Sequence, residues 1–215
     1  MRFLLCLAFL PALAAQSTTV LDNPTVRVID ALDQPHRKGA LHKHDYPRVM
    51  IYLTDGDLDI ATQDGHVEHQ HWKAGDVAWS PAGGLHTSEN VGEAPLRIIE
   101  VEIKSPPPPA PLKRNPALDP LALDPKRNHL LFENPLARVF ISTLEVDGRE
   151  KWHEHAGARL AVLLTPLSAR VEFPKKQPAP MNGGPGDVFW SLEPVRHRTT
   201  NLGARPARIV VVEVK

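Results

Sequence analysis

The sequence repeats itself once, and the offset between matching residues is 111 from one end of the repeat to the other. The matching residues are Asn23 and Asn134, His42 and His153, His44 and His155, Arg48 and Arg159, Gly75 and Gly186, Trp79 and Trp190, His86 and His197, Asn90 and Asn201, and Glu102 and Glu213. Because one offset fits every pair, no net insertion separates the two copies. Self-similarity at a fixed period indicates a duplicated architecture. The sequence therefore predicts two similar units of about ninety residues each, within the usual size range of a domain.

Within each unit the hydrophobic pattern is that of β-strands, and no stretch keeps a helical period. The strands predicted in the first unit cover residues 20–29, 39–44, 48–54, 58–62, 67–72, 77–80, 86–90 and 96–104, and those in the second cover 137–144, 152–155, 160–165 and 207–214. Asp55-Gly56 and Asp64-Gly65 are turn dipeptides between such strands. These patterns predict an all-β chain.

Segment 105–127 separates the two units and is rich in proline. It contains the run Pro106 to Pro109 and further prolines at positions 111, 116, 120 and 125. Such a composition favours an extended polyproline II conformation and predicts a semi-rigid spacer. The predicted division of the chain is a signal peptide over 1–15, a first unit over 16–104, the linker 105–127 and a second unit over 128–215.

The first fifteen residues have the layout of a secretory signal peptide. Arg2 precedes the apolar run from Phe3 to Leu10, and small residues suited to cleavage follow up to Ala15. The apolar run is well short of the ~20 residues that a membrane-spanning helix needs. Cleavage there removes Cys6, the only cysteine of the chain. We expect a periplasmic or secreted protein that has no disulfide and is not inserted in a membrane.

Histidines occur in a pattern typical of an open metal site. His42 and His44 lie one residue apart on a predicted strand, so their side chains point to the same face. His86 opens a later strand, and a third imidazole there completes a convergent set. The second unit repeats the set at His153, His155 and His197.

These residues resemble the two sequence motifs of the cupin superfamily, G-x5-H-x-H-x3-4-E-x6-G and G-x5-P-x-G-x2-H-x3-N. The second motif is matched in the first unit at Gly75, Pro81, Gly83, His86 and Asn90. The first is matched at His42, His44 and Gly56, with Gly39 closer than the pattern asks. The second unit has lost the loop pattern of the second motif, since Leu192 and Pro194 replace its proline and glycine.

The resemblance implies two tandem jelly-roll barrels joined by the proline-rich linker, a bicupin. It also implies a divalent transition metal held by the three histidines of each barrel. We expect iron, with manganese, nickel, copper and zinc as alternatives.

Arg48 and Arg159 stand where the family carries its metal-binding glutamate. An arginine has no lone pair to give to a metal. Three interpretations stay open for it. The favoured one is an internal ion pair with Glu102 in the first unit and Glu213 in the second, because these acids recur together with the arginines. Alternatively, the arginines clamp the carboxylate or phosphate of a substrate, or they turn outward.

Two other groups of residues stand out beside the histidine sets. Trp79 and Trp190 either line a site for a ring-shaped ligand or, as we favour, pack between the sheets. His66, His69 and His71 follow a turn, do not recur at the offset of 111, and are left out of the site as part of a solvated hairpin.

The functional expectation is a metal-dependent dioxygenase acting on a small molecule, because three neutral imidazoles leave positions open for dioxygen and substrate. Two alternatives are a non-catalytic cupin that binds a small molecule or carbohydrate, and a metal-dependent isomerase. Formal charge is balanced, with 25 basic and 25 acidic residues, so nothing points to nucleic acid. The protein is expected to be a monomeric bicupin or a homo-oligomer.

Overall fold

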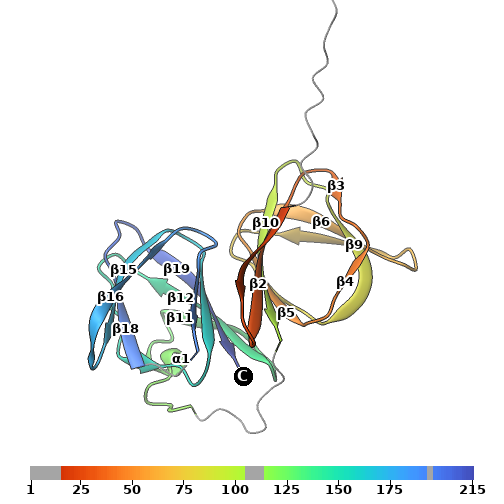
Figure 1. Cartoon of the computed structure of the whole chain (residues 1–215). Helices are drawn as coiled ribbons and strands as arrows, with labels where there is room; N and C mark the ends of the chain where they lie inside the picture. The colour runs from red at the N-terminus through yellow and green to blue at the C-terminus, as the bar shows by residue number, and fades with distance from the viewer. Residues whose placement is uncertain (1–15, 105–113, 193–195) are drawn as a thin grey trace, which may run out of the picture.

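The computed structural model describes residues 16–104, 114–192 and 196–215. The predicted signal peptide and the proline run of the linker lie outside these residues. The chain forms two β-barrels that lie side by side (Figure 1). Two tandem barrels and an all-β chain are thus confirmed. Among the described residues, no helix has both the length and the apolar character needed to span a bilayer.

The first barrel is built from two antiparallel sheets. One has the strand order β1-β2-β10-β5-β8, and the other has the order β3-β9-β6-β7 with β4 beside β9. The strands are β1 (Gln16–Asp22), β2 (Val26–Asp33), β3 (Arg37–Lys38), β4 (His42–His44), β5 (Arg48–Tyr52), β6 (Gly56–Thr62), β7 (Val67–Trp72), β8 (Val77–Ser80), β9 (Gly83–Asn90) and β10 (Leu96–Ile103).

The second barrel repeats this arrangement. Its sheets have the orders β11-β12-β19-β14-β17 and β13-β18-β15-β16, and a short helix precedes its first strand. The elements are α1 (Pro120–Leu123), β11 (Asn128–Glu133), β12 (Ala137–Leu144), β13 (His153–Glu154), β14 (Arg159–Leu163), β15 (Leu167–Phe173), β16 (Lys176–Gly183), β17 (Val188–Ser191), β18 (Arg196–Asn201) and β19 (Ala207–Val214).

Some strands differ from the prediction. The single strand predicted over 20–29 is two strands, β1 and β2, because Asn23 turns the chain between them by accepting hydrogen bonds from the N–H groups of Thr25 and Val26. Strands β3, β11, β15, β16, β17 and β18 were not predicted. The sequence of β16 contains Pro178 and Pro180, which argue against a strand interior, but β16 lies at the edge of its sheet, where proline is tolerated.

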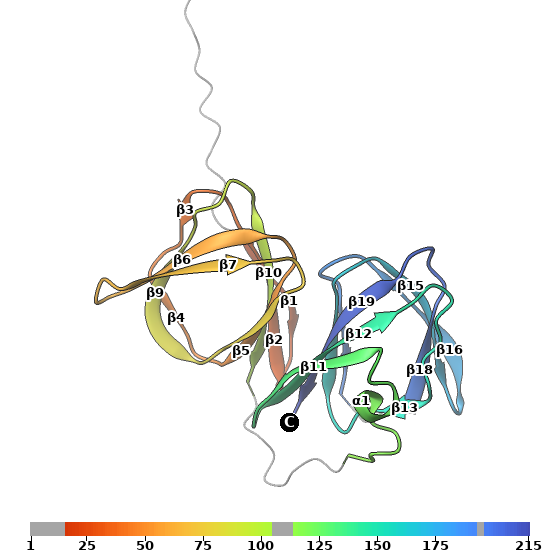
Figure 2. The ribbon, with the colours of Figure 1, turned by 180° about the vertical axis from the view of Figure 1, so that it is seen from behind.

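One sheet of each barrel packs against the other barrel, and this contact forms the largest apolar core of the molecule. Strand β5 shows how: Val49 and Ile51 lie in the core shared with the second barrel, whereas Arg48, Met50 and Tyr52 line the cavity of their own barrel. Because side chains alternate between the two faces of a strand, a facing strand such as β5 has one face buried in the shared core and the other in its own barrel. Figure 2 shows the first-barrel strands β1 and β2 facing the second barrel.

Candidate metal centres

The first barrel brings His42, His44 and His86 together at the wall formed by β4 and β9. The two strands are antiparallel partners, and His42 lies directly opposite His86. One ring nitrogen from each of the three histidines lies within 4.8 Å of the others. The Nε2 atoms of His42 and His44 are 3.1 Å apart.

Hydrogen bonds at Nδ1 fix which nitrogen two of these imidazoles present. His42 Nδ1 donates to the carbonyl oxygen of Ala40 at 2.8 Å, and His86 Nδ1 donates to that of Gly84 at 2.7 Å. Because a carbonyl only accepts, Nδ1 carries the proton in both rings, and Nε2 keeps its lone pair in the neutral ring.

This arrangement fits a cation. The Nε2 atoms of His42 and His44 point to a common position and lie 3.1 Å apart, where a bound cation would accept both lone pairs. Imidazoles that bind a transition metal such as zinc at about 2.0–2.1 Å place their nitrogens at about this separation. The first triad therefore has the donor set and the geometry of a three-histidine metal centre.

The second barrel repeats the triad with His153, His155 and His197, all of which are buried. His153 lies opposite His197 in the pair formed by β13 and β18. His153 Nδ1 donates to the carbonyl oxygen of Lys151 at 3.0 Å, and His155 Nδ1 lies 2.7 Å from a carboxylate oxygen of Glu213. These contacts again leave Nε2 free to bind a metal.

Glu213 orients a metal-site histidine in the second barrel, a role that sequence reasoning missed, and Glu102 takes the equivalent position in the first. Glu213 contacts His155, and Glu102 lies 3.9 Å from Nδ1 of His44. An arginine on the neighbouring strand neutralises each acid. Arg27 Nε donates to Glu102, and Arg138 Nη1 donates to Glu213 at 3.2 Å. Arg27 and Arg138 are also 111 residues apart, which is the sequence signal that would have identified them as the partners.

The favoured interpretation, that Arg48 forms an ion pair with Glu102, is wrong, because Arg48 pairs with a different acid. The two residues face each other in the pair formed by β5 and β10, but the Arg48 guanidinium turns to Glu100, with Nε 3.3 Å from Oε2. Arg48 Nε also contacts Sδ of Met50 at 2.9 Å. The side chain does not turn outward, since Arg48 is 7% exposed. Glu100 was overlooked because Val211 stands at its repeat position.

In the second centre, the predicted pair of Arg159 with Glu213 is also absent. Among the described residues, no carboxylate oxygen lies within the 4.0 Å of an ion pair from the Arg159 guanidinium. Its Nη2 lies 3.5 Å from Nδ1 of His197, and its Nη1 is buried with no hydrogen-bond partner in the described part of the chain. Burial lowers the pKa of Arg159 to about 10.

Burial also lowers the pKa of two of the imidazoles. It holds the pKa of His155 well below its ordinary value, and the positive charge of Arg159 acts in the same direction. Burial likewise lowers the pKa of His86. Both effects favour the neutral imidazole, which is the form that binds a metal.

Each triad lines a cavity, and the two cavities differ in size and lining. The first has a volume of about 810 Å³ and carries the carboxylates of Asp33, Glu68 and Glu100. The second has a volume of about 260 Å³. Its apolar lining includes Phe140, Ala161, Val171, Phe173, Met181, Phe189, Ile209 and Val211.

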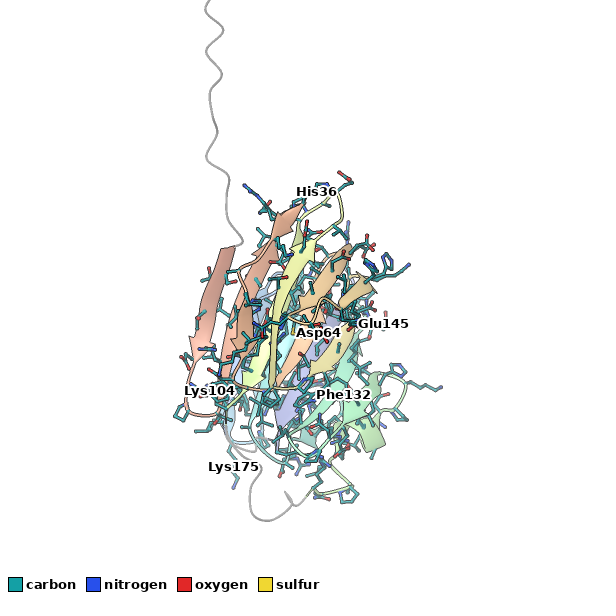
Figure 3. All side chains as sticks on the ribbon, turned by 90° about the vertical axis from the view of Figure 1, so that its right-hand side faces the viewer. His36, Asp64, Lys104, Phe132, Glu145 and Lys175 are labelled. Atoms are coloured by element: carbon teal, nitrogen blue, oxygen red, sulfur yellow. The ribbon has the colours of Figure 1, made fainter. Side chains whose placement is uncertain are left out.

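The remaining candidate residues lie as follows. Trp79 and Trp190 pack against the core between the barrels, as favoured, and each also lines the cavity of its own barrel. His69 and His71 are exposed on β7 and are each paired with an aspartate at 2.6 Å. Neither joins a triad. Figure 3 views the first barrel from the side away from the second barrel and shows Asp64 in the turn that leads into this strand.

Comparison with known proteins supports the assignment suggested by the motifs. A family model described as a cupin domain matches residues 31–102. The β-alanine degradation protein BauB of Pseudomonas aeruginosa is 31% identical over 90 residues, which cover 42% of this chain and 94% of that protein. The oxalate decarboxylase OxdC of Bacillus subtilis is 28% identical over 89 residues, which are 40% of this chain but only 23% of that protein.

Solved structures match over both barrels at low sequence identity. AerE from Microcystis aeruginosa superposes with a TM-score of 0.63 and 12% identity, over 94% of this chain and 97% of that one. A Bacillus subtilis oxalate decarboxylase also gives 0.63 and 12%, over 93% of this chain and 72% of that one. At such identities the likeness concerns the fold. With two barrels, two histidine triads and the cupin-domain match, the chain belongs to the cupin superfamily, as a two-barrel member.

Proposed function

We propose that the protein is an exported, metal-dependent oxidoreductase of the dioxygenase type that acts on a small molecule. The observation that carries the proposal is the geometry of the triads, in which three imidazoles present nitrogen donors to one point at the wall of a cavity. A metal bound there supplies Lewis acidity and electron transfer, with coordination positions open for dioxygen and substrate.

The protein residues around each centre would hold and shield that chemistry. The carbonyl oxygens of Ala40 and Gly84 fix the imidazole rings of His42 and His86, so little reorganisation accompanies metal binding. Glu213 does the same for His155 through Nδ1. The barrel walls limit access of water to the bound substrate.

Metal content tests the first part of the proposal. The protein isolated from its native host is expected to carry one to two transition-metal ions per chain by elemental analysis. Replacing His42 and His44 together by alanine removes two of three donors from the first centre, so the ion content falls by one while the thermal unfolding transition persists. The double replacement His69→Ala with His71→Ala is the matched control, because it also removes two strand histidines. Undiminished metal content in the first double variant would reject the centre.

Oxygen consumption tests the reaction class. We expect iron-loaded protein to consume dioxygen in the presence of its substrate and to lose this activity on chelation. The similarity to oxalate decarboxylase favours a second candidate, a metal-dependent decarboxylase of a small carboxylic acid. That enzyme would release carbon dioxide without net oxygen consumption. Ligand binding that survives chelation with no turnover would favour a plain binding module instead.

Export is the remaining part of the proposal and is based on the pattern from Arg2 to Ala15. N-terminal sequencing of the protein from its native host is expected to begin near Ala15 or Gln16. An intact Met1 on protein recovered from the cytoplasm would contradict export.

A further inference from the structure

The two barrels place an arginine at the same position but surround it differently. Arg48 and Arg159 are 111 residues apart, and each has a buried Nη1 atom without a hydrogen-bond partner in the described part of the chain. In the first barrel the Arg48 guanidinium has two side-chain contacts, the sulfur of Met50 at 2.9 Å and the carboxylate of Glu100 at 3.3 Å. Its positive charge is therefore matched within the protein.

Both of these contacts are lost in the second barrel. Met50 faces Glu100 across β5 and β10, and the equivalent pair across β14 and β19 is Ala161 facing Val211. Ala161 and Val211 line the same cavity as Arg159, and neither side chain carries a hydrogen-bond acceptor.

Among the described residues that line the second cavity, the one carboxylate is that of Glu150, and it does not replace Glu100. Glu150 accepts a hydrogen bond from the N–H of Thr199 at 2.9 Å, and its carboxylate lies beyond ion-pair distance from Arg159. A largely buried guanidinium with no anion in contact is costly, because the more distant carboxylates of Glu213 and Glu150 repay its desolvation only in part. A cation on the neighbouring histidines would add a second positive charge to the same cavity.

We propose that the second barrel binds a small organic carboxylate through Arg159, and that Glu100 prevents the same binding in the first barrel. The inference rests on the proposed function in that it names the ligand class of the same site. The guanidinium offers two parallel N–H donors that match a carboxylate. The apolar lining of the 260 Å³ cavity suits the hydrocarbon body of an organic acid better than inorganic phosphate.

Calorimetric titration of the metal-free full chain with benzoate and with its neutral analogue benzamide tests the proposal. Benzoate is expected to bind once per chain and about tenfold or more tighter than benzamide, because an ionic hydrogen-bond pair is formed. Arg159→Met is expected to remove this preference, and Arg159→Lys to keep part of it. Arg170→Met is the control, since Arg170 is an exposed arginine on β15 of the same barrel.

The position that distinguishes the barrels gives the sharper test. Val211→Glu gives Arg159 the carboxylate partner that Arg48 has, so benzoate affinity is expected to fall about tenfold or more. Val211→Gln introduces a side chain of the same size as glutamate but without its charge, so benzoate affinity is expected to be retained. In the converse variant, Glu100→Val, a second benzoate site is expected in the first barrel. Thermal unfolding of every variant separates lost binding from lost folding.

Several outcomes would overturn the proposal. For the wild type, they are equal affinity for benzoate and benzamide, tighter binding of phosphate than of benzoate, and no saturable binding of benzoate, butanoate or hexanoate. For the variants, they are undiminished benzoate affinity in Arg159→Met and equal losses of benzoate affinity in Val211→Glu and Val211→Gln. Because the titration uses metal-free protein, its failure is distinct from a failure to bind metal. Protein that binds benzoate through Arg159 but takes up no metal would contradict only the proposed function.

Discussion

At the scale of single residues, one histidine of each centre lies beside a glutamate, and this glutamate is paired with an arginine. In the second barrel His155 contacts Glu213 at 2.7 Å, and Glu213 accepts a hydrogen bond from Arg138 at 3.2 Å. Burial raises the pKa of Glu213, although the charges of Arg138 and Arg114 oppose this shift. A carboxylate that is only partly compensated by arginine makes a strong acceptor for the imidazole N–H, which increases the basicity of Nε2.

A double-mutant cycle tests the pairing of Arg48 in the first barrel. Arg48 and Glu100 are both largely buried and lie 3.3 Å apart, so we expect a coupling energy of about 0.5–3 kcal/mol between Arg48→Met and Glu100→Gln. The cycle of Arg48→Met with Glu102→Gln is expected to give a smaller coupling, because Glu102 pairs with Arg27. The free energy of unfolding in denaturant measures both. A larger coupling to Glu102 than to Glu100 would contradict the observed geometry.

The histidines were predictable from sequence, and the partner of Arg48 was not. His42 and His44 share a strand face by their spacing alone, and the fixed repeat offset confirms which histidines belong together. The partner of Arg48 depends on which of two same-face acids, Glu100 or Glu102, a long side chain reaches. Both acids lie on the same face of β10, so the strand period does not encode which of them the arginine reaches.

At the scale of elements, the segment before β11 is more than a connection. Asp119 accepts hydrogen bonds from the N–H groups of Leu121 and Ala122 and so caps α1. Its carboxylate also binds the Arg138 guanidinium through two contacts of 2.7 and 2.8 Å. The described part of the predicted linker, residues 114–127, thus packs onto the second barrel and extends its charge network. For residues 105–113 the spacer stays a prediction.

Replacing Asp119 tests this contact through its pH dependence. Burial alone would raise the pKa of Asp119, but its hydrogen bonds and attraction to Arg138 outweigh burial and hold the pKa below the ordinary value of 3.8. A depressed folded-state pKa contributes stability above the ordinary value, and this stability is lost as the pH falls through the folded pKa. Asp119→Asn is therefore expected to lower the free energy of unfolding at pH 7 by about 1–3 kcal/mol, because Glu213 still pairs with Arg138.

The measurement is urea unfolding of the wild type and the variant between pH 7 and pH 3. The difference between them is expected to shrink as Asp119 of the wild type becomes protonated. Glu145→Gln, at an exposed site, is the control and is expected to show little difference at any pH. A constant difference down to pH 3 would show that the Asp119 charge does not stabilise the fold.

At the scale of the whole molecule, the barrels form one body with a pseudo-twofold relation. The shared core contains Val49 and Ile51 of the first barrel beside Val162 and Val210 of the second. An arginine at the same repeat position in each barrel contacts the opposite barrel. Arg97 lies against Gly186 and donates to the carbonyl oxygen of Pro185 at 3.0 Å, and the Arg208 guanidinium lies against Gly75. Because each pair is offset by 111, the contact is the same surface used twice, as in a symmetric dimer fused into one chain.

A shared core predicts that the barrels unfold together. Phe140 is 1% exposed and belongs to the internal core of the second barrel, away from the contact between the barrels. Phe140→Ala removes about 3–5 kcal/mol of packing from that barrel alone. If the apolar contact couples the barrels, calorimetry of the variant gives one transition at a lower temperature, with calorimetric and van't Hoff enthalpies equal. If each barrel is stable by itself, the scan splits into two transitions, and the first-barrel transition keeps its wild-type temperature. Separation of the barrels would expose Val49, Ile51 and their neighbours to water, which is why the single transition is expected.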